Sequence, residues 1–301
     1  MTISRAQLAK ELEPGLNALF GLEYDRYENE AAEIFESEGS DRAFEEEVML
    51  SGFGTAPVKT EGSAINFDDA QETYTARYTM ETIALAFSIT EEAVEDNLYD
   101  RLAARYTRAL ARSMAQTKQI KGASVLNNAF STGSPIGDGA ALCSAAHPSL
   151  SGNQNNLLAT PADLNETSLE DVLIQVAGFT DERGLKIAVR GTKLLIPKEL
   201  QFIAERIINS NLRSGTADND VNAMKSMGML PEGAVVNHFF TDADAWFVKT
   251  DCPNGFKLFN RTPLKTAMEG DFDTGNMRFK ARERYSFGVS DWRCVFGTPG
   301  A

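Results

Sequence analysis

The hexapeptide CSAAHP, residues 143–148, contains the one pair of side chains whose types and spacing suit a nucleophile and its base. Cys143 and His147 lie four residues apart, which suits a thiol activated by an imidazole, or half of a metal site. A structural zinc site needs four ligands, and no second CxxC or HxxxH supplies the others. We therefore interpret the pair as a loop thiol and a loop histidine. A cytosolic enzyme using Cys143 and His147 remains an alternative.

The rest of the composition narrows the possible chemistry further. The sequence has three widely spaced cysteines and two histidines, which predicts reduced thiols and argues against chemistry that needs several imidazoles. No glycine pattern matches a phosphate-binding loop, and no GxSxG is present. No apolar run approaches a membrane span, and no signal peptide opens the chain, so we expect a protein made in a cytoplasm without membrane contact. We expect no catalytic, cofactor-binding or metal-binding residues and no cofactor.

Charge is distributed unevenly along the 301 residues, whose net charge is −14. The first 100 residues carry 23 acidic and 6 basic side chains, and the remainder carry 20 and 23. An acidic balance argues against a free-standing nucleic-acid-binding protein, which would show a basic stripe. It fits a half that docks on a basic partner surface.

The longest predicted element is a helix over residues 88–122. Its acidic residues precede its basic ones, as the helix macrodipole favours, and Ser88 with Glu91 has the spacing of a capping box. An apolar stripe recurs every four residues: Val94, Leu98, Leu102, Tyr106, Leu110 and Met114. Such a length suits either a core helix or a structural strut.

Three segments precede this helix. Residues 3–20 predict a helix interrupted by Pro14 and Gly15. Residues 24–48 are acidic with few apolar anchors, which indicates an arm that packs on something else or stays mobile. Residues 49–87 predict a long β-hairpin in which Tyr74, Ala76, Tyr78 and Met80 alternate on one face. Because an isolated two-stranded ribbon is marginally stable, the hairpin lies on its own domain or reaches a neighbouring subunit.

The remaining elements suggest a compact α/β subdomain and a return of strands. After a long loop, residues 131–166, a helix over 167–183 is predicted, with a Thr167/Glu170 capping box and a stop at Gly184. The other elements are a strand or strand pair over 186–197, a helix over 198–210, a flexible stretch over 211–228, strands over 234–240, 245–250 and 255–261, and a closing strand from Met277. The closing strand has a basic face formed by Arg278, Lys280 and Arg282. We expect this face to meet the acidic amino-terminal half rather than phosphate.

This order of parts resembles the major capsid protein of tailed bacteriophages, the Hong Kong-phage-type shell fold. The closing FKARERYSFGVSDWRCVFGTPG resembles the terminal strand of that family. The segment FFTDADAWFVKTDCPNGFKLFNR, residues 239–261, and the SAAHPSLSG loop are similar to the Mu-like prophage head-subunit branch. The resemblance covers most of the chain from about residue 48.

The resemblance implies an α+β fold with five parts. These would be an N-terminal arm (1–47), an extended β-hairpin loop (48–87), a peripheral domain with a long spine helix (88–149), an axial α/β domain (150–256) and return strands of the peripheral domain (257–301). Residues 211–228 would lie near a symmetry axis. The hairpin would lie over an adjacent subunit.

The implied function is self-assembly into hexamers and pentamers of an icosahedral head, with a shell rearrangement during maturation. The head would enclose double-stranded DNA without sequence-specific binding. Scaffolding, portal or decoration proteins would be partners, and the protein would be located in the virion after assembly in the host bacterial cytoplasm. Candidate subunit contacts are Phe53, Lys59, Phe67, Tyr74, Tyr78, Arg278, Lys280 and Arg282.

Certain relatives cross-link subunits through a lysine of the extended loop. Lys59 is the only lysine there, but its partner asparagine and an assisting glutamate cannot be matched, so we interpret it as an ordinary surface lysine. An encapsulin-like compartment, which encloses enzymes instead of DNA, is an alternative. A monomeric binding module is another, and it would need the hairpin folded onto its own core.

Overall fold

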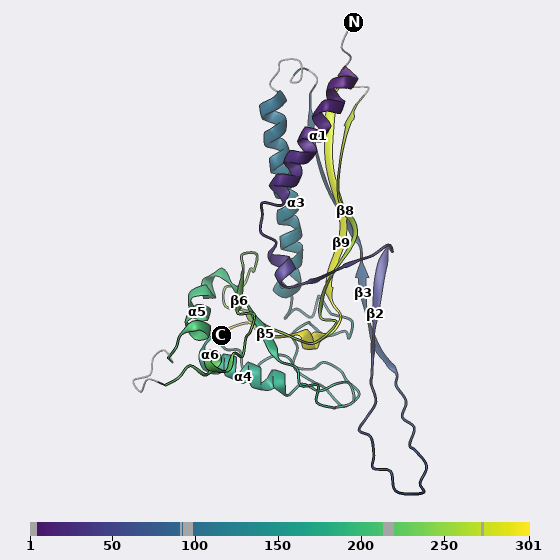
Figure 1. Ribbon diagram of the computed structural model, residues 1–301, viewed down its shortest axis with the longest axis vertical. Helices are drawn as coiled ribbons and strands as arrows, with labels where there is room; N and C mark the ends of the chain where they lie inside the picture. Colours follow the sequence, from purple (N-terminus) through teal and green to yellow (C-terminus); the bar gives the residue numbers. More distant parts are fainter. Residues whose placement is uncertain (1–4, 91, 93–98, 213–219, 272–273) are drawn as a thin grey trace.

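The chain forms two packed units and a protruding hairpin (Figure 1). The computed structural model describes residues 5–90, 92, 99–212, 220–271 and 274–301. The long-sheet unit contains a sheet in the order β1-β8-β9-β4 and two helices. The short-sheet unit contains a sheet in the order β10-β7-β5-β6 with helices around it. The hairpin consists of β2 (Phe44–Leu50) and β3 (Glu72–Thr79), which pair antiparallel.

The long-sheet unit is built on the helix α3 (Tyr99–Asn127), whose 29 residues span roughly 44 Å. Its buried side chains, including Leu110 and Met114, pack on Phe279 and Ala281 of the sheet. A second helix, α1 (Arg5–Tyr24), lies beside α3 and adds Phe20 to this core. The strands are β1 (Glu36–Gly39), β4 (Glu81–Ile89), β8 (Phe256–Gly270) and β9 (Met277–Val289).

The predicted start of the long helix is wrong. Ser88 does not cap a helix, because it lies in β4 and is paired with Arg278 of β9. The alternation of Ile83, Phe87 and Ile89 explains the difference, since these side chains fill the core under α3 as a strand would place them. Residues 91 and 93–98, which hold most of the acidic helix start, lie outside the described residues.

Pro14 and Gly15 do not break the first helix, because α1 runs from Arg5 to Tyr24 across both. The predicted strand over 72–87 is in fact two strands, which separate at Met80. β3 belongs to the hairpin, whereas β4 belongs to the long sheet. The predicted alternation is confirmed, since Ala76, Tyr78 and Met80 are buried together.

The acidic segment after α1 packs on both units of its own chain. Residues 29–47, here called the strap, contain the short helix η1 (Glu30–Glu33), the strand β1 and the start of β2. Ile34 is fully buried, and the ring of Phe35 meets those of Phe256 and Phe287. Three well-placed apolar side chains, Ala31 being the third, thus anchor a segment whose composition is mostly polar.

The short-sheet unit has a core formed by Leu194, Ile196, Val248, Trp246 and Phe296. It contains the strands and helices β5 (Gly191–Pro197), β6 (Ala234–Asn237), β7 (Trp246–Thr250), β10 (Val295–Thr298), α4 (Glu166–Ala177), η2 (Lys198–Leu200), α5 (Gln201–Asn209), α6 (Ala223–Met227) and η3 (Trp292–Cys294). The sequence predicts α4, β5, α5, β6 and β7 in the right order. The stretch predicted to be flexible, 211–228, contains the helix α6, and its segment 213–219 lies outside the described residues.

Three boundaries differ from the prediction. The capping box of α4 is formed by Asn165 and Ser168 instead of Thr167 and Glu170. The helix ends at Ala177, and Gly184 serves a later turn with φ of 85°. β8 is also longer than predicted and continues to Gly270, so that it pairs with β9 along its whole length.

Candidate assembly surfaces and buried network

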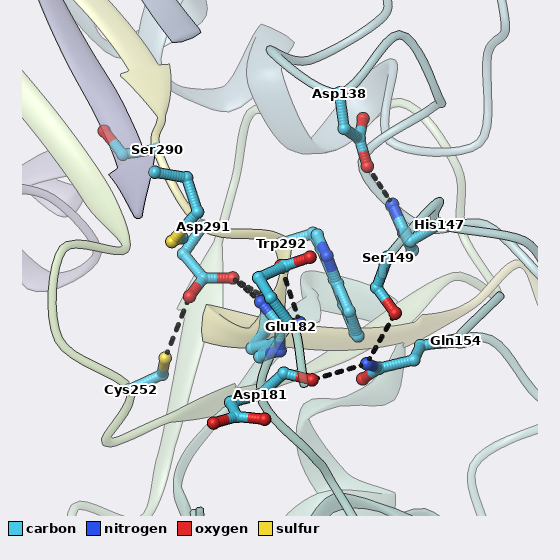
Figure 2. Close-up of polar contacts among 12 residues, drawn as sticks. Asp138, His147, Ser149, Gln154, Asp181, Glu182, Cys252, Ser290, Asp291 and Trp292 are labelled. Atoms are coloured by element: carbon cyan, nitrogen blue, oxygen red, sulfur yellow. Dashed lines mark hydrogen bonds and ion pairs between the residues drawn. The ribbon is translucent and has the colours of Figure 1, made fainter. Parts of the chain in front are cut away.

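The Cys143/His147 pair is not assembled in the structure. His147 Nε2 lies 3.0 Å from Asn156 Oδ1. His147 Nδ1 lies 2.6 Å from Asp138 Oδ2 (Figure 2). Both ring nitrogens are therefore occupied by groups other than the thiol. Cys143 is buried, and burial raises the pKa of its thiol well above the ordinary range. A buried, neutral thiol without a base does not act as a nucleophile.

Asn156 fixes how this network is protonated. Its Nδ2 donates to the carbonyl oxygens of Leu142, Trp292 and Val295, so its Oδ1 must face Ser144 N and His147 Nε2. His147 Nε2 consequently donates. The 2.6 Å contact between Nδ1 and Asp138 then holds one further proton, shared between the two side chains. The network ties the long loop to the closing strand.

Trp292 is the centre of this network. The ring of His147 stacks on that of Trp292, with 4.4 Å between the ring centroids and 2° between the ring planes. The Arg293 guanidinium lies 4.4 Å from the centroid of the Trp292 ring. Arg293 donates to Glu182 at 2.9 Å and to Asp291 at 3.2 Å. Burial opposes the charge of Arg293, but these two carboxylates offset that effect and raise the pKa of the guanidinium. The arrangement is a buried polar core around SDWRC, in which Trp292 Nε1 and Glu182 Oε2 have no hydrogen-bond partner among the described residues.

A second set of buried charges holds the strap. Lys193 Nζ donates to both the carbonyl and the carboxylate of Glu33 at 3.0 Å, and Lys249 Nζ donates to the carbonyl of Ile34 at 2.9 Å. Lys193 and Lys249 are cross-strand partners of the short sheet, which explains why both reach the same segment.

Lys257 holds the strap at its other end. This lysine lies on β8, and its Nζ contacts Glu38 at 3.1 Å and also Glu47. Because Lys193 and Lys249 belong to the short sheet and Lys257 to the long sheet, the strap joins the two units. These lysines were not predicted as contacts, although each is the one charged residue of a mostly apolar segment: KLLIP, WFVKT and GFKLF.

The candidate contacts on the hairpin separate into two groups. Phe53, Lys59 and Phe67 lie in the exposed apex between β2 and β3. Tyr78, in contrast, is 3% exposed, and its hydroxyl bonds Ser290 of its own chain. The hydroxyl of Tyr74 donates to the carbonyl of Ser290 at 3.3 Å. These two tyrosines therefore fasten the base of the hairpin to its own subunit.

The basic face of the closing strand is exposed, as the alternation predicts. Phe279 and Ala281 face α3, whereas Arg278, Lys280 and Arg282 face away from it. Arg278 pairs with Asp271 in the adjoining turn. Within the described residues, Lys280 and Arg282 have no acidic partner, so the expected contact with the acidic half is not made inside one subunit.

Two further observations concern metal binding and membrane insertion. Among the described residues, no three His, Cys, Asp or Glu side chains are grouped so as to hold a metal ion. Within the same residues, no helix has the length and apolar character needed to cross a membrane.

Solved structures show where else this fold occurs. The chain matches the capsid of Myoviridae phage XM1 with a TM-score of 0.56 at 13% identity, covering 89% of each chain. It matches a virus-like particle from Pyrococcus furiosus with a TM-score of 0.54 at 8% identity, covering 94% of this chain and 97% of the other. The capsid of a native GTA particle gives 0.54 at 12% identity, with 89% of each chain covered. At such identities, the likeness concerns the fold.

A match to a family model identifies the family of the chain. No curated protein matches this sequence. The family model described as phage capsid protein matches residues 73–297, which is well over half of the chain. The α+β fold agrees with the tailed-phage major capsid structures. The chain therefore belongs to the phage capsid protein family.

Proposed function

We propose that the chain is the repeating subunit of an icosahedral phage head and that the hairpin apex binds an adjacent subunit. The observation that carries this proposal is the exposure of large apolar side chains at the apex: Val58 is 94% exposed, Phe67 98% and Phe53 60%. Large apolar side chains exposed together on one loop favour an interaction site. Residues 51–71 form no strand pairs within the subunit, so a neighbour is the natural partner.

The second proposed contact joins the basic face of β9 to an acidic surface of a neighbouring copy. Lys280 and Arg282 are available for such a contact, and the hairpin carries Glu61 and Asp69 at its apex. Opposite charges would set the register of the two subunits more than the affinity. Lys59 would be a surface residue of this contact and would form no covalent bond.

The proposed shell consists of hexamers and pentamers and rearranges during maturation. The five parts of the chain would be the arm, extended loop, peripheral domain, axial domain and return strands, with the boundaries given above. The head would hold double-stranded DNA, and scaffolding, portal or decoration proteins would join it. Assembly would take place in the host bacterial cytoplasm, without catalysis by the subunit. Assignment to the Mu-like branch remains a prediction.

The test is size-exclusion chromatography of the expressed chain, followed by negative-stain microscopy of the earliest fraction. Wild type should yield closed particles or ring-shaped capsomers. The triple variant Phe53→Ser, Val58→Ser and Phe67→Ser should remain unassembled. Its control replaces three exposed apolar residues elsewhere: Leu22→Ser, Leu150→Ser and Ile174→Ser. A wild-type monomer at every salt concentration, or equal loss in both variants, would overturn the proposal.

Two alternatives have their own readouts. Particles containing protein cargo and no nucleic acid, judged from their absorbance ratio, would indicate an encapsulin-like compartment. Cys143→Ala should assemble as wild type does. A catalytic activity lost in that variant would instead favour the enzyme.

A further inference from the structure

The solvent-facing side of α3 carries a row of arginines without acidic partners. Arg105, Arg108 and Arg112 are all exposed, and within the described residues none of them forms an ion pair or a hydrogen bond to a carboxylate. Some other cations of the long-sheet unit have a partner, as Lys121 has Glu81 and Arg278 has Asp271, whereas Lys280 and Arg282 on β9 have none in the described part of the chain. The row therefore concentrates unpaired positive charge on one helix face of a chain whose net charge is −14.

Helix geometry places the three guanidinium groups on one line. At about 100° and 1.5 Å per residue, they fall within an arc of about 60° and span about 10 Å along the axis. Thr107, Leu110 and Ala111 face the opposite way, into the core. Figure 1 shows α1 and α3 together on one side of the long sheet, so the row faces away from β8 and β9.

The position of the row is unfavourable for the subunit alone. Like charges three and four residues apart repel each other, and α3 has no acidic residue between Arg101 and Asn127 to compensate. The macrodipole favours cations in the last turn of a helix, whereas these arginines occupy the first half of α3. Because no carboxylate of the described residues pairs with these arginines, their charge favours an anionic partner outside the subunit.

A surface hollow adjoins the row. It has a volume of about 340 Å³ and is lined by Arg108, Arg112, Ser113 and Gln116 of α3 and by residues of α1 and the turn after it. Those additional residues include Tyr27 and Glu23, whose carboxylate accepts from the Tyr27 hydroxyl at 3.2 Å. Guanidinium forks beside amide and hydroxyl donors suit phosphate oxygens.

We propose that this face of α3 binds the phosphate backbone of duplex DNA. One DNA strand carries a phosphate every 3.4 Å or so along the duplex axis, so the 10 Å row matches about three of them. The proposal rests on the proposed head function, because it supplies the DNA-facing surface of that shell. It also separates the two basic faces of the long-sheet unit, since the face on β9 is assigned to a neighbouring subunit.

The test measures binding of the soluble full-length chain to a 20-base-pair duplex of arbitrary sequence between 50 and 200 mM salt. The variant Arg105→Gln, Arg108→Gln and Arg112→Gln should lower the slope of log K against log salt by about 2 to 3, because each lost phosphate contact contributes about 0.9. The matched control, Lys186→Gln, Arg190→Gln and Lys198→Gln, removes three exposed charges from the short-sheet unit and should leave the slope unchanged. Replacement of the three arginines by lysine should retain most of the slope.

Several results would overturn the proposal: no duplex binding by wild type, equal slope changes in test and control variants, or arginine-dependent binding of a polyglutamate peptide in place of the duplex. The last result would assign the face to an acidic protein. Particle formation is scored separately by microscopy. Loss of DNA binding by the arginine variant, with normal particle formation, therefore supports the inference. If wild type forms no particles, that result counts against the head function alone.

Discussion

Replacement of Lys257 by methionine tests whether buried charges hold the strap. The Lys257 side chain is 6% exposed, and its ammonium contacts Glu38 and Glu47, of which Glu47 is also bonded to Ser290. Methionine has a similar length and preserves packing, but it donates no hydrogen bond. The variant therefore removes the charge while leaving the apolar contacts largely in place.

The expected magnitude follows from the exposure of the two carboxylates. A hydrogen bond to a charged group contributes about 1.5–3 kcal/mol when buried. The Glu38 side chain is 45% exposed and can regain water, whereas that of Glu47 is 26% exposed and regains less. We expect Lys257→Met to lower the free energy of unfolding by about 2 kcal/mol, mostly through Glu47. Glu47→Gln should cost about 1 kcal/mol, because Lys257 keeps Glu38.

The assay is urea unfolding of the unassembled chain, followed by the fluorescence of the fully buried Trp246 and Trp292. The double variant should cost less than the two single costs combined by about 1 kcal/mol, since both remove the same interaction. Lys280→Met, at an exposed position without a partner, is the control and should change stability by less than about 0.5 kcal/mol. Equal effects of Lys257→Met and Lys280→Met, or full additivity of Lys257→Met and Glu47→Gln, would refute the reasoning.

Three further predictions concern packing, the buried network and pH. Gly288→Ala should cost about 1–3 kcal/mol by overpacking, because the new Cβ would lie 2.6 Å from the Tyr78 ring; Gly270→Ala, with nothing within 4 Å, is its control in the same urea assay. His147→Ala should cost about 3–5 kcal/mol, since it removes the ring that pairs with the buried Asp138 carboxylate and leaves that carboxylate the backbone N–H of Ala140; adding Asp138→Asn should recover part of that loss, and thermal unfolding that shows no recovery would argue against a shared proton. Stability should fall as pH rises above about 9, by up to about 1.4 kcal/mol per pH unit for each group that stays protonated only when folded. All contributing groups act in the same direction, because each has a higher pKa in the folded state and keeps a proton that the unfolded state releases. Burial raises the pKa of the thiols and phenols, namely Cys143, Cys252, Cys294, Tyr24, Tyr74, Tyr78 and Tyr285. Burial lowers the pKa of Lys193 and Lys257, but their acidic partners outweigh it and raise the pKa overall. Equilibrium unfolding measured from pH 7 to 11 checks this, and a stability that stays constant over that range would contradict it.

Local pattern was sufficient where one face of an element is buried along its length. The alternation in β9 correctly predicted that Phe279 and Ala281 face the core while Lys280 and Arg282 face outward. Ala76 and Tyr78 of β3 were predicted in the same way. These predictions succeed because successive side chains of a strand point to opposite faces, so the alternation of apolar and polar residues shows which side chains face the core.

The failures occurred where a distant partner decided the outcome. Ser88 has the spacing of a helix cap, but pairing with β9 places it in a strand, so tertiary contact overrides the local signal. Pro14 lies in a helix that packing against α3 supports. Asn156 and Asp138 were missed because their partners, the Trp292 carbonyl and the His147 ring, become neighbours only on folding.

The sequence by itself determined the α+β class, the order of the elements and the long helix, since each depends on side-chain periodicity within one segment. Only the tertiary structure decided that the acidic strap stays on its own subunit. Its composition is too polar to anchor it, and the lysines that neutralise its carboxylates and bind its carbonyl groups come from β5, β7 and β8, more than 150 residues later in the chain. Charge partners so distant in sequence produce no local pattern from which they could be predicted, because only folding of the backbone brings them together.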